Sequence, residues 1–310
     1  MNEIILHHYP ASPFSEKIRL VYGYKKLTWK SVIIPSIMPK PDVVALTGGY
    51  RKTPFMQIGA DIYCDSVLIC DQLEKLQPEP TLYPAASEGN ARIVAQWADT
   101  TLFWAAMAYN LGPKGAAQAF AKAPPEARQA FGEDRAKMSG SMTRLRPADA
   151  SAAYKSYLQR LEAMLTQNSF LLSPAPTIAD FAAYHSLWFT RVCVPVMADI
   201  FQATPLVLKW MDSMAAYGQG KQEKFSASDA ITLAANSTPA ALASSIFQDE
   251  HGIALGTPVS IAAESFGAET TEGELIAATA TQYSLRRHDE RAGIVHVHFP
   301  RIGYVLKAAE

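Results

Sequence analysis

Apolar positions in the first part of the chain alternate between the spacings of strands and helices. Residues 3–8 and 29–35 are short and apolar, and turn-forming residues follow the first of them, so each predicts a buried strand. Between them the apolar positions recur at helical spacing, with the charged Glu16, Lys17 and Arg19 off the apolar face. Strand, helix and strand in this order predict a parallel pair joined by a crossover.

A hairpin and a second helix follow. Residues 53–58 and 61–64 have the composition of short strands, and Gly59-Ala60 between them is a turn signal. The apolar positions of residues 66–76 suit a helix that packs on the sheet. We therefore assign residues 1–78 to a first, α/β domain in the order βαβ–ββα.

Beyond a proline-rich linker at residues 79–87, the pattern changes to long helices. Thr177 and Asp180 have the spacing of a capping box before an apolar run, which marks one helix start. We predict an all-helical domain over residues 88–237, with helices at roughly 88–110, 125–140, 150–167, 178–191, 205–217 and 228–235.

The last part of the chain changes character again. Residues 238–310 contain short β-rich stretches separated by Gly or Pro, at 256–263, 274–287, 293–299 and 303–308. They predict a small antiparallel unit of four or five strands. The pattern assigns this extension no role beyond dimer contact, pocket cover or partner binding.

Composition excludes several classes of function. With 28 Lys and Arg against 29 Asp and Glu and no basic tract, nucleic acid is not an expected partner. The N-terminus lacks the basic start of a secretory signal, and no apolar run approaches the ~18 residues of a membrane helix. The three cysteines lack CxxC spacing, so we expect neither a disulfide framework nor a zinc site, and a reducing cytoplasm is the default.

The stretch Ser12-Pro13-Phe14-Ser15 lies between the first strand and the first helix. Ser12 suits an N-cap, and Pro13 suits the first helical position, where its missing N–H costs nothing. The N-terminus of a helix also stabilises anions. Ser12 can therefore cap the helix and face an anionic ligand at the same time.

Three motifs follow one another in the first domain: Ser12-Pro13-Phe14-Ser15, Arg51-Lys52-Thr53-Pro54-Phe55 and Asp65-Ser66. In this order they resemble the N-terminal domain of the glutathione transferase superfamily, closest to its tau and omega classes. Thr177-Ile178-Ala179-Asp180 resembles the capping-box motif of the helical C-terminal domain of that superfamily. The resemblance covers residues 1 to about 225. It implies a thioredoxin-like domain followed by an all-helical domain, and leaves the β-rich extension unmatched.

The resemblance implies that Ser12 donates its hydroxyl to the sulfur of glutathione and favours the thiolate. A thiol pKa of about 8.5 lowered by two units corresponds to about 2.7 kcal/mol, within reach of one hydroxyl and a helix N-terminus. Ser15 is the second candidate for this role and Tyr9 the third. A cysteine at position 12 would have favoured thiol exchange, whereas serine favours conjugation.

The rest of glutathione has candidate partners from the same resemblance. Thr53, before a Pro54 expected to be cis, would offer its backbone to the cysteinyl portion as an added strand would. Lys52 would face the glycine carboxylate, Ser66 at a helix start would receive the γ-glutamyl carboxylate, and Asp65 would pair with the α-amino group. Many relatives carry Glu in place of Asp65. Ser66 also suits a plain helix N-cap.

The electrophile needs an apolar pocket beside the sulfur. The resemblance places that pocket near Phe14, Trp97, Phe103, Trp104 and Met107. Aromatic and Met side chains at helical spacing are also typical of a core, so each of these residues has a structural alternative.

A few other residues could carry chemistry. Cys64 precedes Asp65, but a small apolar residue at the end of a buried strand explains it more simply. His296 and His298 share one face of a strand and, with His288, could form a metal site. Solvated histidines on a polar strand face are the simpler interpretation, and we predict no metal.

These observations favour a cytoplasmic glutathione transferase that conjugates the thiolate to a small hydrophobic electrophile. A symmetric homodimer is expected from the resemblance. The alternative is a glutathione-binding or protein-interaction module with the transferase fold and little activity, in which the extension does the distinctive work. A glutathione-dependent reductase is disfavoured by the missing cysteine.

Overall fold

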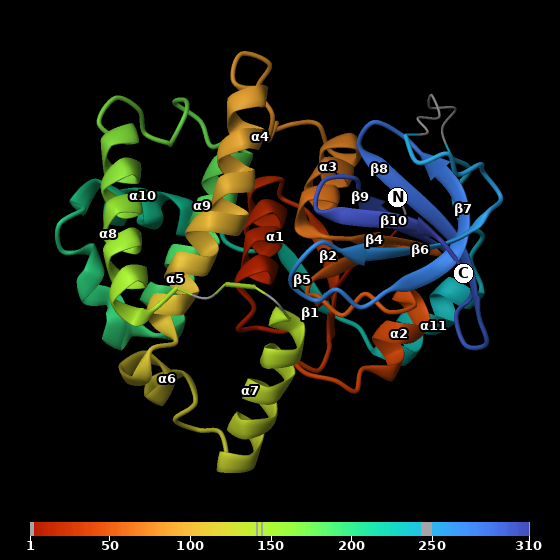
Figure 1. Ribbon diagram of the computed structural model, residues 1–310. Coiled ribbons are helices and arrows are strands. Elements are labelled where there is room, and N and C mark those ends of the chain that lie inside the picture. The colour runs from red at the N-terminus through yellow and green to blue at the C-terminus, as the bar shows by residue number, and fades with distance from the viewer. Residues whose placement is uncertain (1–2, 141, 144, 243–249, 310) are drawn as a thin grey trace.

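A computed structural model of the chain describes residues 3–140, 142–143, 145–242 and 250–309. Figure 1 shows a group of helices on one side and a sheet on the other, with α1 between them. The first part of the chain forms β1 (Ile5–His8), α1 (Pro13–Tyr24), β2 (Thr28–Ile33), α2 (Pro41–Thr47), β3 (Phe55–Ile58), β4 (Asp61–Cys64) and α3 (Ser66–Leu76). Strand β1 pairs with β2 in parallel and with β3 antiparallel, and β3 and β4 form the predicted hairpin. This is the thioredoxin-like arrangement that the sequence indicates, except that the predicted order βαβ–ββα lacks α2.

Helix α1 is covered on more faces than its apolar pattern predicts. Glu16, Lys17 and Arg19 are at most 4% exposed, because α1 packs against both α3 and α9 (Ile178–Trp188). Arg19 pairs with Glu16 at 2.7 Å, and Lys17 pairs with Asp99 at 2.5 Å. Pairing offsets the cost of burying these charges, so they belong to the interior.

The helical part follows the predicted order with two short additions, α6 and η3. Its elements are α4 (Glu88–Trp97), η1 (Ala98–Leu102), α5 (Phe103–Asn110), α6 (Pro113–Ala119), α7 (Pro125–Ser139), α8 (Pro147–Met164), α9, η2 (Phe189–Cys193), η3 (Pro195–Phe201) and α10 (Pro205–Ala215). The capping box at the start of α9 is confirmed, because the Thr177 N–H donates to Asp180 Oδ2 at 2.8 Å. Asp180 Oδ1 also accepts from the Leu171 N–H and from Trp210 Nε1, so the cap joins three segments.

The extension continues the sheet of the thioredoxin-like part. Its elements are β6 (Pro258–Ala263), β7 (Thr271–Ala278), β8 (Gln282–Asp289), β9 (Gly293–Pro300) and β10 (Tyr304–Ala308). The strand order is β10-β6-β7-β8-β9-β4-β3-β1-β2-β5, with the extension strands antiparallel to one another. Strand β9 lies parallel to β4, with Ile62 opposite Val297. The separate antiparallel unit that we expect from the sequence is therefore fused to the first domain along β4.

Two details of the sequence-based assignment change. Residues 274–287, identified from the sequence as one β-rich stretch, are the end of β7, a turn and most of β8. The range 88–237, expected to be all-helical, contains β5 (Lys221–Lys224), which pairs with β2. The helix expected at 228–235 is present as α11 (Ala227–Ala235), but it packs against α2 and β9. Strand β5 is short, charged and exposed along its length, so no apolar pattern marks it. The domain boundaries themselves stay predictions.

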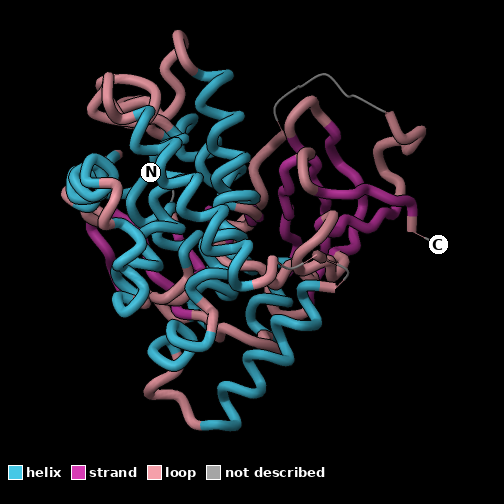
Figure 2. Tube along the Cα trace, turned by 60° about the vertical axis from the view of Figure 1, so that its left-hand side comes forward, coloured by secondary structure: helices cyan, strands magenta, loops and turns pink. Residues whose placement is uncertain are grey.

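The sheet separates two apolar cores. Alternation along β1 places Leu6 in a core shared with α1, α3 and the helical part, and Ile5 in a core shared with α2, α11 and the extension. Figure 2 shows the strands near the C-terminus to one side of the helices. No helix in the described ranges is long and apolar enough to cross a membrane.

The expected solvated face of β9 is buried at its centre. His298 is 2% exposed, because β9 has a strand on each side and its ring stacks on Tyr63. Its Nε2 lies 3.0 Å from Asp61 Oδ1 and its Nδ1 lies 2.8 Å from the Ser284 hydroxyl. His298 is therefore an interior residue that joins the extension to β4. Within the part of the chain that is described, no cluster of His, Cys, Asp or Glu is arranged to hold a metal ion.

Candidate active site

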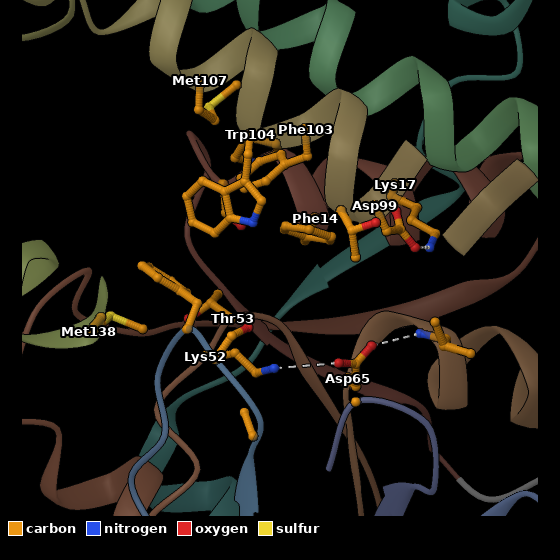
Figure 3. Close-up of a pocket in the computed structure, with 18 of the residues that line it drawn as sticks. Phe14, Lys17, Lys52, Thr53, Asp65, Asp99, Phe103, Trp104, Met107 and Met138 are labelled. Carbon is orange, nitrogen blue, oxygen red and sulfur yellow. Dashed lines mark hydrogen bonds and ion pairs between the residues drawn. The ribbon is translucent and has the colours of Figure 1, made fainter. Parts of the chain in front are cut away.

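A cavity of about 1880 Å³ lies between the first domain, the helical part and the extension. Most of the residues predicted for the site line it: Tyr9, Ser12, Phe14, Lys52, Thr53, Asp65, Phe103, Trp104 and Met107. Figure 3 shows Phe14, Phe103 and Trp104 on one side and Lys52 and Asp65 on the other. Ser15, Pro54, Ser66 and Trp97 are not among the lining residues.

Ser12 occupies the N-cap of α1, as its sequence context predicts. Its hydroxyl oxygen accepts from the Ser15 N–H at 3.2 Å, and Pro13 is the first helical residue. The Ser12 hydroxyl proton has no acceptor among the described residues, although the side chain is only 2% exposed. Ser12 can therefore cap the helix with its lone pair and still donate to a ligand.

The two alternatives to Ser12 lie in different surroundings. Ser15 is fully buried, and its hydroxyl has no hydrogen-bond partner in the described structure. Tyr9 is partly exposed and lines the cavity. Of the three candidates, Ser12 alone combines a place on the cavity wall with a position at the helix N-terminus.

Thr53 offers free backbone groups to the cavity. The Thr53–Pro54 peptide bond is cis, as the resemblance implies. The Thr53 N–H and C=O make no hydrogen bond to another described residue, although Phe55, two residues on, is already paired with β1. Such an unpaired segment beside a sheet can accept an extended peptide through main-chain hydrogen bonds.

Asp65 is held in place from three directions. It caps α3, because its Oδ1 accepts from the Val67 N–H at 3.1 Å, and its φ of 75° turns the backbone out of the strand. Its Oδ2 accepts from the Tyr304 hydroxyl at 2.8 Å and lies 3.6 Å from Lys52 Nζ. The Asp65 N–H donates to the Tyr50 hydroxyl at 3.0 Å. Sequence reasoning missed both tyrosines, because neither belongs to one of the three motifs and Tyr304 lies 239 residues further along the chain.

Ser66 contacts a buried charge cluster, formed by Lys17, Asp99 and His185, that the sequence does not reveal. Lys17 Nζ donates to Ser66 Oγ at 3.2 Å and to Asp99 Oδ2 at 2.5 Å. His185 Nε2 lies 2.9 Å from Asp99 Oδ1. Since an ammonium group has only donors, Lys17 leaves the Ser66 hydroxyl proton free for an anionic ligand.

The charge cluster has a defined protonation pattern. Burial opposes ionisation of Asp99, but the Lys17 ammonium and the His185 contact outweigh burial and lower its pKa below the usual range. Burial likewise opposes the charge of Lys17, but Asp99 raises its pKa. Burial lowers the pKa of His185, so its imidazole is neutral at pH 7. A charged Lys17–Asp99 pair with a neutral histidine therefore lies beneath the start of α3.

Further cations lie near the loop that carries Thr53. Lys40 lines the cavity and donates from Nζ to the Arg51 carbonyl at 3.1 Å. Burial and the nearby Arg135 lower its pKa to about 8. Arg51 forms ion pairs with Asp134 and with Glu269, the latter at 2.6 Å. Sequence reasoning missed Lys40 because it lies in a proline-containing loop with no helical or strand pattern.

The apolar wall is built from aromatic rings in series. The Phe14 ring lies 4.7 Å from that of Phe103, which lies 4.9 Å from that of Trp104. Trp104 in turn contacts Phe266 of the extension at 5.0 Å. Trp97 points elsewhere, since its ring packs edge-on against Tyr157. Trp97 is therefore a packing residue of the helical part and not part of the cavity wall.

Cys64 is the last residue of β4 and is fully buried. Burial raises the pKa of its thiol well above the usual value, and it is not among the residues that line the cavity. Its placement fits a small apolar residue at the end of a strand.

Comparison with known proteins identifies the class to which this fold and cavity belong. The protein-family model for the glutathione S-transferase N-terminal domain matches residues 6–81, and the family model for the C-terminal domain matches residues 117–213. The crystal structure of a GST-like protein from Pseudomonas syringae is 40% identical, covers 100% of both chains and has a TM-score of 0.82. The chain therefore belongs to the glutathione transferase superfamily.

More distant structures share the fold over part of the chain. A glutathione S-transferase from Rhodospirillum rubrum is 20% identical over 69% of this chain and 88% of its own, with a TM-score of 0.53. One from Methylobacillus flagellatus with glutathione bound is 17% identical over 69% of this chain and 95% of its own, with a TM-score of 0.50. No curated protein matches the chain. The Pseudomonas protein thus shares the extension, and both family models end before it.

Proposed function

We propose that this protein is a glutathione transferase that joins the thiolate of glutathione to a hydrophobic electrophile. The observation that carries the proposal is one cavity that has Ser12 at a helix N-terminus, the free backbone of Thr53 and the carboxylate of Asp65 on its wall. An aromatic wall begins at Phe14, two residues after Ser12. A thiol seated at Ser12 would therefore face an apolar surface where a second substrate can bind.

Glutathione would bind as an extended strand beside Thr53. Its γ-glutamyl carboxylate would accept from the Ser66 hydroxyl and the first N–H groups of α3, where the helix dipole favours an anion. Its α-amino group would pair with Asp65. Its glycine carboxylate would lie toward Lys40 and toward Lys52, both of which line the cavity, with the α-amino group replacing the Lys52 ammonium beside Asp65 Oδ2. Each charged end of the tripeptide thus has either a partner of opposite charge or, for the γ-glutamyl carboxylate, hydrogen-bond donors at a helix N-terminus.

Ser12 would act by making the thiolate more stable than the thiol. Its hydroxyl donates a hydrogen bond to the sulfur while the α1 dipole favours the negative charge. The thiol proton passes to solvent. The sulfur lone pair then forms a bond to the electrophilic carbon, and the leaving group departs with the electron pair of the broken bond. At pH 7 the rate would rise in proportion to the fraction of bound glutathione that is ionised.

A glutathione-binding module with little activity is the second candidate. The observation that favours it is the small exposed fraction of Ser12, at 2%. In that case the cavity would bind glutathione or a partner without presenting the sulfur to an electrophile. We further propose a cytoplasmic, symmetric homodimer that uses a small-molecule electrophile and no nucleic acid, membrane or metal partner.

Calorimetry and turnover together separate these candidates. We expect glutathione to bind at millimolar concentration or below, and a chlorodinitrobenzene to be conjugated. Ser12→Ala should lower kcat/KM at pH 7 by about 8- to 25-fold, the change in the ionised fraction for a thiol pKa that returns to about 8.5 from one to two units below it. Ser15→Ala is the matched control, because it removes a hydroxyl from the first turn of the same helix but not from the cavity wall.

Each other outcome has a defined meaning. No binding of glutathione at millimolar concentration would contradict the proposed function. Binding without turnover would support the module. Turnover that survives Ser12→Ala but is lost in Ser15→Ala or Tyr9→Phe would move the hydroxyl to that residue.

A further inference from the structure

We propose that the C-terminal extension is a working part of the glutathione site, in which Tyr304 positions the Asp65 carboxylate. This inference rests on the proposed function, because it concerns how the same ligand is held. It assigns a role to a region that lies outside both matched family domains.

The curvature of the sheet brings Tyr304 to Asp65. Strands β9 and β10 are far apart in the strand order, yet only residues 301–303 separate them in the chain. The extension must therefore curl back on itself, and Figure 1 shows β10 close to β9 and β4. Because Asp65 directly follows β4, the first residue of β10 arrives beside it.

Tyr304 restrains both members of the charged pair at this end of the cavity. Its hydroxyl donates to Asp65 Oδ2, and Lys52 Nζ lies 4.6 Å from the centre of its ring. The ring is 5% exposed and lines the cavity. Burial and the nearby Asp65 raise the pKa of Tyr304 well above 10, so the hydroxyl remains a donor at physiological pH.

The restraint matters because Asp65 has a short side chain with two tasks. Its Oδ1 accepts from the Val67 N–H at the start of α3 and its Oδ2 accepts from the Tyr304 hydroxyl, so each oxygen keeps one further acceptor position for a ligand ammonium group. The hydrogen bond from Tyr304 fixes Oδ2 in the conformation that caps the helix and faces the cavity. A carboxylate fixed before the ligand arrives loses less conformational freedom on binding. Tyr304 is therefore a positioning residue for glutathione, with no direct part in the chemistry at sulfur.

The test is a split between binding and turnover. Tyr304→Phe keeps the ring and removes the hydroxyl, so we expect the Kd and KM for glutathione to rise about 10-fold, the size for a hydrogen bond to a charged group. At saturating glutathione kcat should change less than twofold. Tyr283→Phe is the matched control, since Tyr283 is buried in the extension but is not among the residues that line the cavity.

A double mutant shows whether Tyr304 acts through Asp65. If it does, Asp65→Ala with Tyr304→Phe should bind glutathione no more weakly than Asp65→Ala alone. Unchanged glutathione affinity in Tyr304→Phe, or a loss equal to that of Tyr283→Phe, would overturn the inference. Failure of the unmodified protein to bind glutathione would instead overturn the proposed function.

A second, independent observation concerns the electrophile. We infer that the β6–β7 loop, residues 264–270, forms a specificity-determining wall through Phe266. The loop is held to α7 by the Gly267 N–H, which donates to the Met138 carbonyl at 2.9 Å. Gly267 has a φ of 68°, and a Cβ there would lie 2.9 Å from the Met138 side chain and 3.0 Å from that of Lys52. The loop thus lies directly on the site, and glycine is needed for this approach.

Phe266 extends the aromatic wall across the cavity. It is partly exposed and touches Trp104, so a flat ligand packed against this pair would contact aromatic rings from two domains. The volume of about 1880 Å³ exceeds the roughly 300–1,000 Å³ of usual ligand pockets, which leaves room for a bulky second substrate beside a tripeptide. We therefore infer that the protein prefers multi-ring aromatic electrophiles to small aliphatic ones.

Paired electrophiles test this preference. Phe266→Ala should lower kcat/KM for a naphthyl-substituted electrophile about 5- to 10-fold, the size of one aromatic contact. It should leave kcat/KM for iodoacetamide within twofold. Ile294→Ala, at a side chain 52% exposed on the extension, is the control and should change neither. Equal losses for both electrophiles, or no loss for either, would overturn the assignment.

Discussion

Two of the buried contacts between the thioredoxin-like domain and the rest of the molecule contain an Asp–His pair. Toward the helical domain, Asp99 meets His185 at 2.9 Å. Toward the extension, Asp61 meets His298 at 3.0 Å. Lys17 and Asp99 line the cavity, as does Gln282, whose amide donates to Ser284 in the second contact. Both contacts therefore connect domain packing to the shape of the site.

The difference between the two contacts lies in the third partner. Lys17 adds a buried positive charge to the first, whereas the second ends in the neutral hydroxyl of Ser284. Removing a carboxylate from the first leaves an uncompensated ion, but removing one from the second leaves only unpaired hydrogen-bonding groups. The loss of stability on removing the aspartate of an Asp–His pair thus depends on whether the third group is a charged lysine or a neutral serine.

The largest expected effect is at the contact with the helical domain. Asp99→Leu strands the Lys17 ammonium, which is fully buried, and should lower the free energy of unfolding by about 3–5 kcal/mol. Adding Lys17→Met should recover most of this loss, because an apolar pair of similar size replaces the ion pair. Urea unfolding of the three proteins provides the comparison. An equal loss in the single and double variants would mean that the charge is not the cause.

A smaller effect is expected at the contact with the extension. Asp61→Ala leaves His298 Nε2 and the Ala240 N–H without their acceptor, and should lower the free energy of unfolding by about 2–3 kcal/mol. Hydrogen exchange should show faster exchange along β8 and β9 than in α9. Glu272→Ala, at an exposed position on β7, is the control. Loss of protection first in α9 would contradict the assignment of Asp61 to this contact.

Two neighbouring histidines of β1, His7 and His8, should make the stability depend on pH. They lie on opposite faces of the sheet. His7, whose partner Gln57 also contacts α11, has its pKa lowered by burial to about 4. His8, beside Arg19, has its pKa lowered by burial and that charge to about 3. The unfolded chain binds these protons near pH 6.5, so stability falls as the pH drops below that value.

At pH 5 each histidine should have removed about 2 kcal/mol relative to pH 8. Urea unfolding at the two pH values measures the loss. In His7→Gln the difference between the two pH values should shrink by about that amount. A stability that rises on acidification, or a slope that His7→Gln leaves unchanged, would show that the histidine does not titrate as described.

Local patterns predict the thioredoxin-like part well. The spacing of apolar residues and the N-cap at Ser12 suffice for α1, and α3 spans Ser66–Leu76 as expected. The pairing of β9 with β4 could not be predicted, because a strand's own pattern does not name its neighbour. The alternating histidines of β9 suggest a solvent-exposed face. His298 is nevertheless buried, because β9 has a strand on each edge and is packed on both faces at this residue.

The same limit applies to the site. Motifs place Ser12, Thr53 and Asp65 on the cavity wall, since each lies at the end of a predicted element. Partners such as Asp99 and Tyr304 come from segments far along the chain and carry no local signal. Their roles depend on three-dimensional packing that only the folded chain shows.

The pKa of the glutathione thiol in its complex with the protein tests the central claim most directly. Thiolate absorbance in the ultraviolet, followed over pH at saturating glutathione, measures it. We predict a bound thiol pKa one to two units below the free value of about 8.5, returning toward that value in Ser12→Ala and unchanged in Ser15→Ala. A bound thiol pKa equal to the free value, or one that Ser12→Ala leaves lowered, would contradict the account.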